Sequence, residues 1–191
     1  MKKNCQQIKE SIEKIRNEIY EWKRELHTLD LNFLLQITLQ WFDCYQWEEP
    51  LEKMVWLYKA LIKEELDEAS EAWYNMDIVE LLDAYVDYLW VTIWYIWFKA
   101  LRDNENVIEW KDKYILNEVT EWVNELLEKI IVPKGLFSLA WLEIAYSNWT
   151  KSLEKRDEND PEGKAGKIIK WPNYVKPDLN KVFDYIKKTR E

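Results

Sequence analysis

Residues 51–98 read LEKMVWLYKALIKEELDEASEAWYNMDIVELLDAYVDYLWVTIWYIWF, and this stretch decides the fold. It contains neither glycine nor proline, the two residues that most disfavour the interior of a helix. The whole chain of 191 residues has only three glycines, all in its last third. Gly-rich phosphate-binding loops are therefore excluded from most of the chain, as are the frequent tight turns of barrels and sandwiches. We expect an all-α fold, a helical bundle with short connections.

Two helices are expected within this stretch. Apolar residues recur at helical spacing over residues 51–74, and residues 78–102 form the most apolar segment of the chain. Asp77 fits the N-cap of the second helix, because its side chain can accept hydrogen bonds from the first free backbone N–H groups. The break at 75–77 is short, so the two helices should form an antiparallel hairpin at the centre of the bundle.

The chain is expected to have three parts: an N-terminal helical arm over residues 1–45, a catalytic helical bundle over 46–154, and a basic, substrate-closing tail with a terminal helix over 155–191. The arm carries a heptad stripe over residues 8–26, which suits a helix that docks on the body or pairs with a partner chain. This stripe favours a homodimer. Further helices are expected at 107–130, 136–154 and 179–189, with an apolar stretch at 31–42, a loop at 133–135 and a longer loop at 155–178.

The charge balance and the cysteines limit the partners and the compartment. The chain carries 36 acidic and 27 basic residues, a formal charge of −9, which argues against a nucleic acid polymer as partner. The most apolar run, residues 88–98, is about half the length that spans a bilayer, so no membrane partner is expected. Cys5 and Cys44 lack metal-ligand spacing, and with no signal peptide recognised the expected location is cytoplasmic.

Acidic side chains gather on the two expected hairpin helices. Residues 64–98 contain no lysine or arginine, and the acidic residues of the second helix stand among apolar neighbours. Carboxylates in such surroundings are costly unless a cation compensates their charge, and Mg²⁺ is the usual cation beside phosphates. An ordinary solvated helix face is the alternative for the first set. The two sets are Glu64, Glu65 and Glu68 on the first helix, and Glu80, Asp83 and Asp87 on the second.

These residues resemble the signature of the all-α nucleoside triphosphate pyrophosphohydrolases, a superfamily that includes MazG-like enzymes, phosphoribosyl-ATP pyrophosphohydrolase and dimeric dUTPases. The signature is E-E-x-x-E, followed on the next helix by E-x-x-D. The matching residues are Glu64, Glu65, Glu68, Glu80 and Asp83. Some members instead use an acidic pair four residues apart, which Asp83 and Asp87 match better. The sequence leaves open whether Glu80 or Asp87 completes the metal site with Asp83.

Two later segments resemble the phage-type branch of the same superfamily. Residues 143–151, EIAYSNWTK, are similar to its E-V-x-x-S-N-M-S-K segment, with Tyr146 where an arginine is common. Residues 166–178, GKIIKWPNYVKPD, are similar to its G-K-v-x-K-x-x-x-Y-x-x-P-D tail. The residues expected to bind the substrate, mainly through its phosphate oxygens, are Asn148, Lys151, Lys167, Lys170 and Tyr174.

The resemblance implies a Mg²⁺-dependent hydrolase, with Mn²⁺ able to substitute, that converts a nucleoside triphosphate and water to the monophosphate and pyrophosphate. The implied metal ligands are Glu65, Glu68, Asp83 and Asp87, and the residue that orients or deprotonates the attacking water is Glu64 or Glu80. Deoxynucleotides are expected by analogy with phage-type members, whereas the base and the number of metal ions are left open.

Two other functions compete with this one. A non-catalytic helical interaction protein would use the heptad stripe and the thirteen tryptophans as its binding surface, because tryptophan and tyrosine often anchor interfaces. A nucleotide-sequestering protein would bind the triphosphate without cleaving it.

Overall fold

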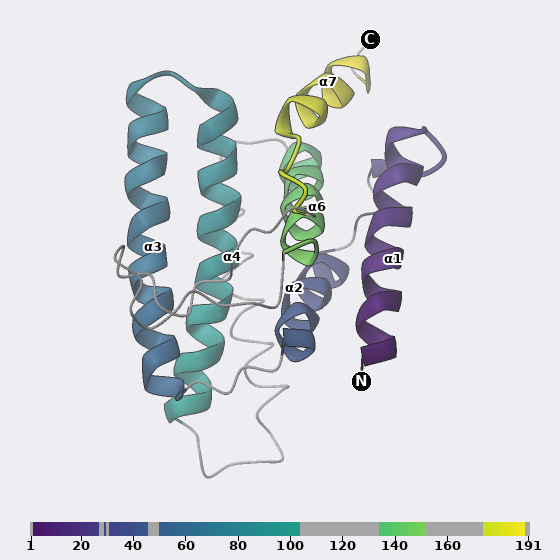
Figure 1. Ribbon diagram of the computed structural model, residues 1–191. Coiled ribbons are helices and arrows are strands. Elements are labelled where there is room, and N and C mark those ends of the chain that lie inside the picture. The colour runs from purple at the N-terminus through teal and green to yellow at the C-terminus, as the bar shows by residue number, and fades with distance from the viewer. Residues whose placement is uncertain are drawn as a thin grey trace. The chain divides into compact units, whose positions relative to one another are not determined.

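The computed structural model describes residues 2–26, 29, 31–45, 50–103, 134–151 and 174–189. Every regular element among them is an α-helix, which confirms the all-α prediction (Figure 1). The helices are α1 (Lys2–Tyr20), α2 (Leu31–Tyr45), α3 (Leu51–Tyr74), α4 (Ile78–Asp103), α6 (Lys134–Trp149) and α7 (Leu179–Thr189). The helix expected over residues 107–130 lies outside the described residues, as does most of the loop expected over 155–178.

The chain groups into two compact units. One unit combines Met1–Trp47 with Gly135–Glu191 and contains α1, α2, α6 and α7; we call it the composite unit. The other unit, Glu48–Lys134, contains α3 and α4; we call it the hairpin unit. The sequence pattern did not predict that both ends of the chain fold together, because a heptad stripe shows that a helix needs a partner without showing which one.

In the hairpin unit, α3 and α4 run antiparallel and lie side by side (Figure 1). Their bounds agree with the helices predicted over 51–74 and 78–102 to within one residue. Away from the turn, the Tyr58 ring centroid lies 5.3 Å from that of Phe98 and 6.5 Å from that of Trp94, and all three side chains are buried. Burying a single phenylalanine side chain in this way contributes roughly 1.5–3 kcal/mol to stability.

The turn between α3 and α4 satisfies the free backbone groups of both helices. The Asp77 N–H donates to the Ala72 carbonyl oxygen at 2.9 Å, and the Met76 N–H donates to the Trp73 carbonyl oxygen at 3.1 Å. These two bonds define a Schellman C-cap, and Met76, with a φ of 57°, occupies the position where glycine is usual. Asp77 Oδ1 accepts hydrogen bonds at 3.1 Å from the N–H groups two and three residues later. The predicted N-cap at Asp77 is therefore confirmed.

The N-terminal helix α1 ends six residues before the predicted limit at residue 26. Trp22 adopts a φ of 60°, a left-handed conformation that interrupts an α-helix, and its ring stacks on that of Tyr185 in α7 with centroids 4.5 Å apart. The predicted end of this helix was therefore wrong. Ile12 and Ile19 of the heptad stripe are fully buried, so α1 docks on the body of the composite unit.

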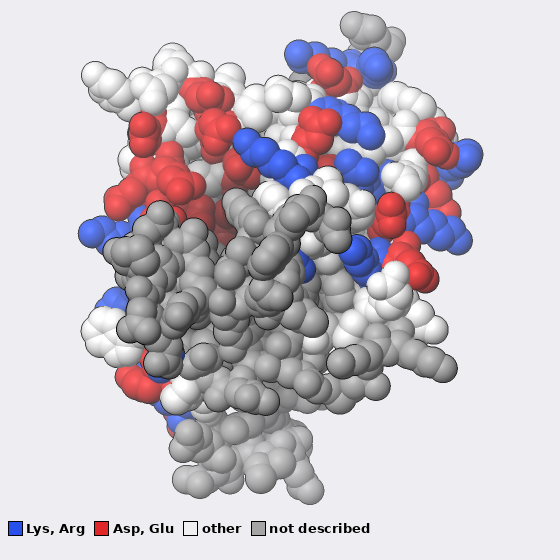
Figure 2. Space-filling view, viewed as in Figure 1, with Lys and Arg blue, Asp and Glu red and all other residues white. Residues whose placement is uncertain are grey.

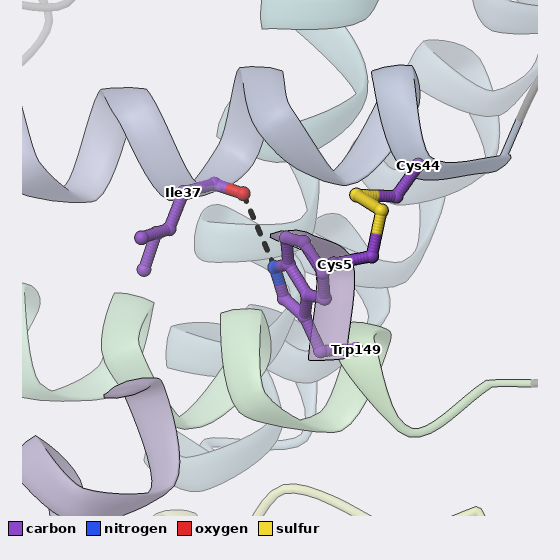
Figure 3. The surroundings of a disulfide bond; sticks show 4 residues. All are labelled: Cys5, Ile37, Cys44 and Trp149. Atoms are coloured by element: carbon purple, nitrogen blue, oxygen red, sulfur yellow. Dashed lines mark hydrogen bonds between the residues drawn. A yellow bond between two sulfur atoms is a disulfide. The ribbon is translucent and has the colours of Figure 1, made fainter. Parts of the chain in front are cut away.

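In the composite unit, α6 is the helix enclosed on most sides. Residues 136–150 are all buried except Ser138 and Tyr146, and Glu143 is the one charged residue of the sequence between Gly135 and Trp149. Three indole N–H groups link α6 to α2. The donors and acceptors are Trp41 and the Asn148 carbonyl oxygen at 2.9 Å, Trp141 and the Thr38 hydroxyl at 3.1 Å, and Trp149 and the Ile37 carbonyl oxygen at 3.1 Å (Figure 3).

Both predicted limits of this helix were wrong: α6 begins at Lys134, within the loop predicted over 133–135, and ends at Trp149, before the predicted end at residue 154. The Thr150 hydroxyl donates to the Ser147 carbonyl oxygen at 2.7 Å and accepts the Val175 N–H at 2.9 Å. Thr150 therefore closes the end of α6 and joins it to the segment that leads into α7, a role that depends on a residue distant in the sequence.

A disulfide bond joins α1 to α2 (Figure 3). Cys5 and Cys44 are 39 residues apart in the sequence, yet their Cα atoms lie 5.6 Å apart. This pairing was not predictable from the sequence, since the spacing of two distant cysteines carries no information on their partners. The bond covalently links the first turns of α1 to the end of α2 within the composite unit.

Loss of the disulfide is expected to lower the free energy of unfolding by about 2–4 kcal/mol, chiefly because the unfolded chain regains freedom between the two cysteines. Denaturant unfolding of the wild type, with and without dithiothreitol, should be compared with that of the Cys5→Ser/Cys44→Ser variant. The variant should match the reduced wild type and should not respond to the reductant. An unchanged wild-type midpoint in dithiothreitol, with thiol release confirmed, would contradict the expectation.

Candidate functional site

The predicted carboxylates of α3 differ in exposure. Glu65 is 8% exposed, Glu64 is half-buried and Glu68 is exposed. All three lie in the half of α3 that is nearer the turn. Burial of a carboxylate is costly unless its charge is compensated. Among these three, Glu65 is therefore the residue whose position is hardest to explain as an ordinary solvated helix face.

The predicted carboxylates of α4 lie along the edge of the hairpin core. Asp83 and Asp87 are half-buried, and the Oδ1 atom of Asp83 is enclosed from solvent. The neighbouring Leu82 and Ala84 are buried. Glu80 stands in the first turn of α4 and is exposed, where the helix dipole favours a negative charge. The two aspartates therefore occupy a more apolar environment than Glu80.

The antiparallel register brings the two sets of carboxylates to similar heights in the hairpin. Glu65 lies nine residues before the end of α3, and Asp87 lies nine residues after the start of α4. Glu68 and Asp83 form a second level, six and five residues from the same ends. At about 1.5 Å per residue, these levels lie roughly 14 Å and 8 Å from the turn. Figure 2 shows acidic side chains gathered over this half of the hairpin.

The donor atoms at these two levels suit a hard divalent cation such as Mg²⁺, which prefers carboxylate oxygens. Each level pairs a carboxylate of α3 with one of α4, and each pair includes an oxygen withdrawn from solvent, on Glu65 at one level and on Asp83 at the other. In the part of the chain that the structure describes, no three acidic, histidine or cysteine side chains come together as a group that could hold a metal ion. The hairpin therefore matches a Mg²⁺ site in the type of its donor atoms and in their positions along the two helices.

The residues predicted to bind phosphate belong to another part of the chain. The Asn148 side chain is buried near the end of α6, and its backbone carbonyl accepts the Lys151 N–H at 3.1 Å. Lys151 and Tyr174 are both half-buried. Lys167 and Lys170 lie outside the described residues. The structure therefore places Asn148 in the interior of the composite unit, a location that the sequence motif did not indicate.

A buried ion pair in the composite unit was missed by the sequence analysis. Arg16 of α1 donates from Nε to Glu143 Oε1 of α6 at 2.6 Å, and the Glu143 side chain is 1% exposed. The Arg16 guanidinium also lies 4.8 Å from the ring centroid of Tyr146. A guanidinium therefore reaches this part of α6 from another helix. The sequence signal that could have revealed the pair is Glu143 itself, the one charged residue between Gly135 and Trp149, since a buried charge needs a partner.

The ion pair alters the protonation behaviour of its neighbours. Burial tends to lower the pKa of Arg16, but the hydrogen bond and the charge of Glu143 outweigh it and raise that pKa above the usual value. Burial, together with the nearby Glu143 carboxylate, raises the pKa of Tyr20 well above that of a free tyrosine. Arg16 is therefore charged and Tyr20 neutral at physiological pH, which keeps the pair intact.

None of the described helices is both long enough and apolar enough to cross a bilayer.

Comparison with known proteins gives no further assignment: no protein-family model, no curated protein and no solved structure matches this chain.

Proposed function

We propose that this chain is a Mg²⁺-dependent nucleoside triphosphate pyrophosphohydrolase, the activity that the sequence resemblance implies. The observation that supports it most is the burial of Glu65 on α3 and of the Asp83 Oδ1 atom on α4 of the same hairpin. Each level of the hairpin thus has one carboxylate oxygen withdrawn from solvent and a second carboxylate on the adjacent helix, and such a pair can share a divalent cation. The carboxylates of an ordinary solvated helix face would instead be exposed.

The roles of the hairpin residues follow from their positions. When bound, Mg²⁺ would neutralise phosphate charge and lower the pKa of the attacking water. Glu64 or Glu80 would accept the proton of that water as its oxygen bonds to the α-phosphorus, and pyrophosphate would leave with the bridging oxygen. The residues proposed to hold the ion are Glu65, Glu68, Asp83 and Asp87. The residues proposed to bind the substrate are Asn148, Lys151, Lys167, Lys170 and Tyr174.

The test is a substrate panel with product identification. Purified protein is incubated with each dNTP and NTP in Mg²⁺, Mn²⁺ or EDTA, and the nucleotides are separated by ion exchange. We expect equal amounts of monophosphate and pyrophosphate, only when a divalent ion is present, with deoxynucleotides preferred. In H₂¹⁸O the label should enter the monophosphate, because the water attacks the α-phosphorus. Label in pyrophosphate, or no product from any nucleotide, would contradict the proposed reaction.

Thermal melting distinguishes cleavage from sequestration. A triphosphate that binds only the folded chain stabilises it by about 2.7 kcal/mol at a concentration one hundred times its dissociation constant. An upward shift with the dNTP and Mg²⁺ but no products would indicate a nucleotide-sequestering protein. Cleavage of a nucleotide to the monophosphate and pyrophosphate would support the proposed hydrolase.

A further inference from the structure

We propose that the turn end of the α3–α4 hairpin is a docking surface for a basic, amphipathic helix of a partner protein. Four large apolar side chains occur within six residues there, and their exposed fractions range from 67% for Trp73 to 88% for Tyr74. We call this set the tip patch; its members are Trp73, Tyr74, Met76 and Ile78. Apolar patches on a folded surface mark interaction sites, and Trp, Tyr and Met are the residue types enriched there.

The tip patch continues along both helices. Leu66 lies seven residues before Trp73, and Tyr85 lies seven residues after Ile78; both are exposed. Residues seven apart occupy the same stripe of a helix, two turns from one another. The exposed apolar surface therefore extends from the turn onto both helices, a shape suited to the apolar face of a helix rather than to a single side chain.

The backbone of the turn supports a functional role for the patch. Met76 occupies the C′ position of the Schellman motif with a φ of 57°, where a residue with a side chain costs roughly 1–2 kcal/mol relative to its favoured conformations. Glycine would fit this position without that strain. Met76 is 81% exposed, so packing within the chain does little to offset this strain, and a contact with another molecule would account for a large apolar side chain at this position.

The charges around the patch identify the partner. Exposed carboxylates accompany the apolar side chains, and residues 64–98 contain no lysine or arginine. The carboxylates are Asp67, Glu71, Asp77 and Glu80. A second copy of this chain would present the same negative charges, and an anionic membrane would also be repelled. A helix with an apolar face and lysine or arginine at its borders complements both features. This inference does not depend on the proposed hydrolase activity.

The probe is a fluorescent helical peptide of about 18 residues made of leucine and lysine, with a leucine–glutamate peptide of the same pattern as its control. Binding to the full chain is followed by fluorescence anisotropy. We expect the lysine peptide to bind and the glutamate peptide to bind much more weakly. Neutralising two carboxylates, with Asp67→Asn/Glu71→Gln, should weaken binding several-fold and reduce its dependence on salt.

The decisive variant is Trp73→Ser/Met76→Gly, which should weaken binding of the lysine peptide at least about tenfold. Both side chains are exposed and Met76→Gly removes the strained conformation, so the double variant should melt close to the wild type. A thermal melt of the double variant therefore checks that unfolding does not explain the loss. Trp56→Ser is the matched control, since Trp56 is 65% exposed on α3, about 25 Å from Trp73 along the helix. It should bind as the wild type does.

Three results would overturn the inference. The first is equal affinity of the wild type and Trp73→Ser/Met76→Gly for the lysine peptide. The second is a dimer in light scattering that this variant converts to a monomer, because the occupant would then be a second copy. The third is co-sedimentation of the wild type, but not of the variant, with phosphatidylcholine–phosphatidylserine vesicles, because the occupant would then be a membrane.

Discussion

Asp83→Asn is expected to lower nucleoside triphosphate turnover at least about 100-fold while the chain stays folded. Asparagine has nearly the volume of aspartate but no negative charge, so it fills the same space and removes the charge of the proposed metal ligand. Because Asp83 Oδ1 is enclosed from solvent, water cannot readily take over its contribution. Glu68→Ala should cause a similar loss of turnover, and because Glu68 is exposed the fold should tolerate it. The measurement is the steady-state rate at saturating Mg²⁺, beside a thermal melt.

Asp67→Asn is the matched control for these variants. Asp67 is an exposed carboxylate next to Glu68 in the sequence but is not among the proposed ligands. Asp67→Asn should leave turnover within about twofold of the wild type. Substitution of a metal ligand should lower turnover and also raise the Mg²⁺ concentration needed for the half-maximal rate. If Asp83→Asn and Glu68→Ala both turn over at rates near that of the wild type, the proposed metal site is wrong.

Arg16→Met is expected to lower the free energy of unfolding by about 3–5 kcal/mol, the largest stability effect among these predictions. The reason is the charge left behind: without Arg16, the Glu143 carboxylate would remain buried without the partner that now lies at 2.6 Å. Arg16 also contributes cation–π contacts with Tyr20 and Tyr146, with its guanidinium carbon 5.4 Å and 4.8 Å from the two ring centroids. Denaturant unfolding with circular dichroism detection gives the value.

A double-mutant cycle separates the stranded charge from simple loss of packing. Glu143→Leu alone should also destabilise, because Arg16 then loses its partner, but Arg16→Met with Glu143→Leu should recover much of the lost stability. The coupling between the two substitutions should reach about 3 kcal/mol, the upper end of the usual range. Strictly additive effects would mean that the two side chains stabilise the fold independently of one another, and the ion pair would then not be the source of the stability.

The helix positions were predictable because the signals that place them are local. The pattern over 51–74 and the capping residue Asp77 act within one or two turns, and both predictions match the structure. The ends of α1 and α6 were predicted less well. Their limits depend on the stacking of Trp22 on Tyr185 and on the hydrogen bond from Val175 to Thr150, which join residues far apart in the sequence.

In the candidate site, too, some features were predictable from the sequence and others were not. The order of the carboxylates along α3 and α4, and hence their two levels, follows from spacing in the sequence once the helices are antiparallel. Which of them are buried does not follow, because Glu64 and Glu65 are neighbours of the same residue type and yet differ in exposure. The interior position of Asn148 was also not predictable, since its motif is compatible with either side of a helix.

The sequence by itself determined that this chain is helical, because it has almost no glycine and its apolar residues repeat at helical spacing. It also determined where the acidic residues stand along the hairpin. Only the tertiary structure decided that Arg16 pairs with Glu143 across 127 residues, that Cys5 bonds to Cys44, and that the tip patch is exposed. The physical reason is that backbone preferences and helix periodicity act over a few residues, whereas burial and charge pairing depend on which distant surfaces meet when the chain packs.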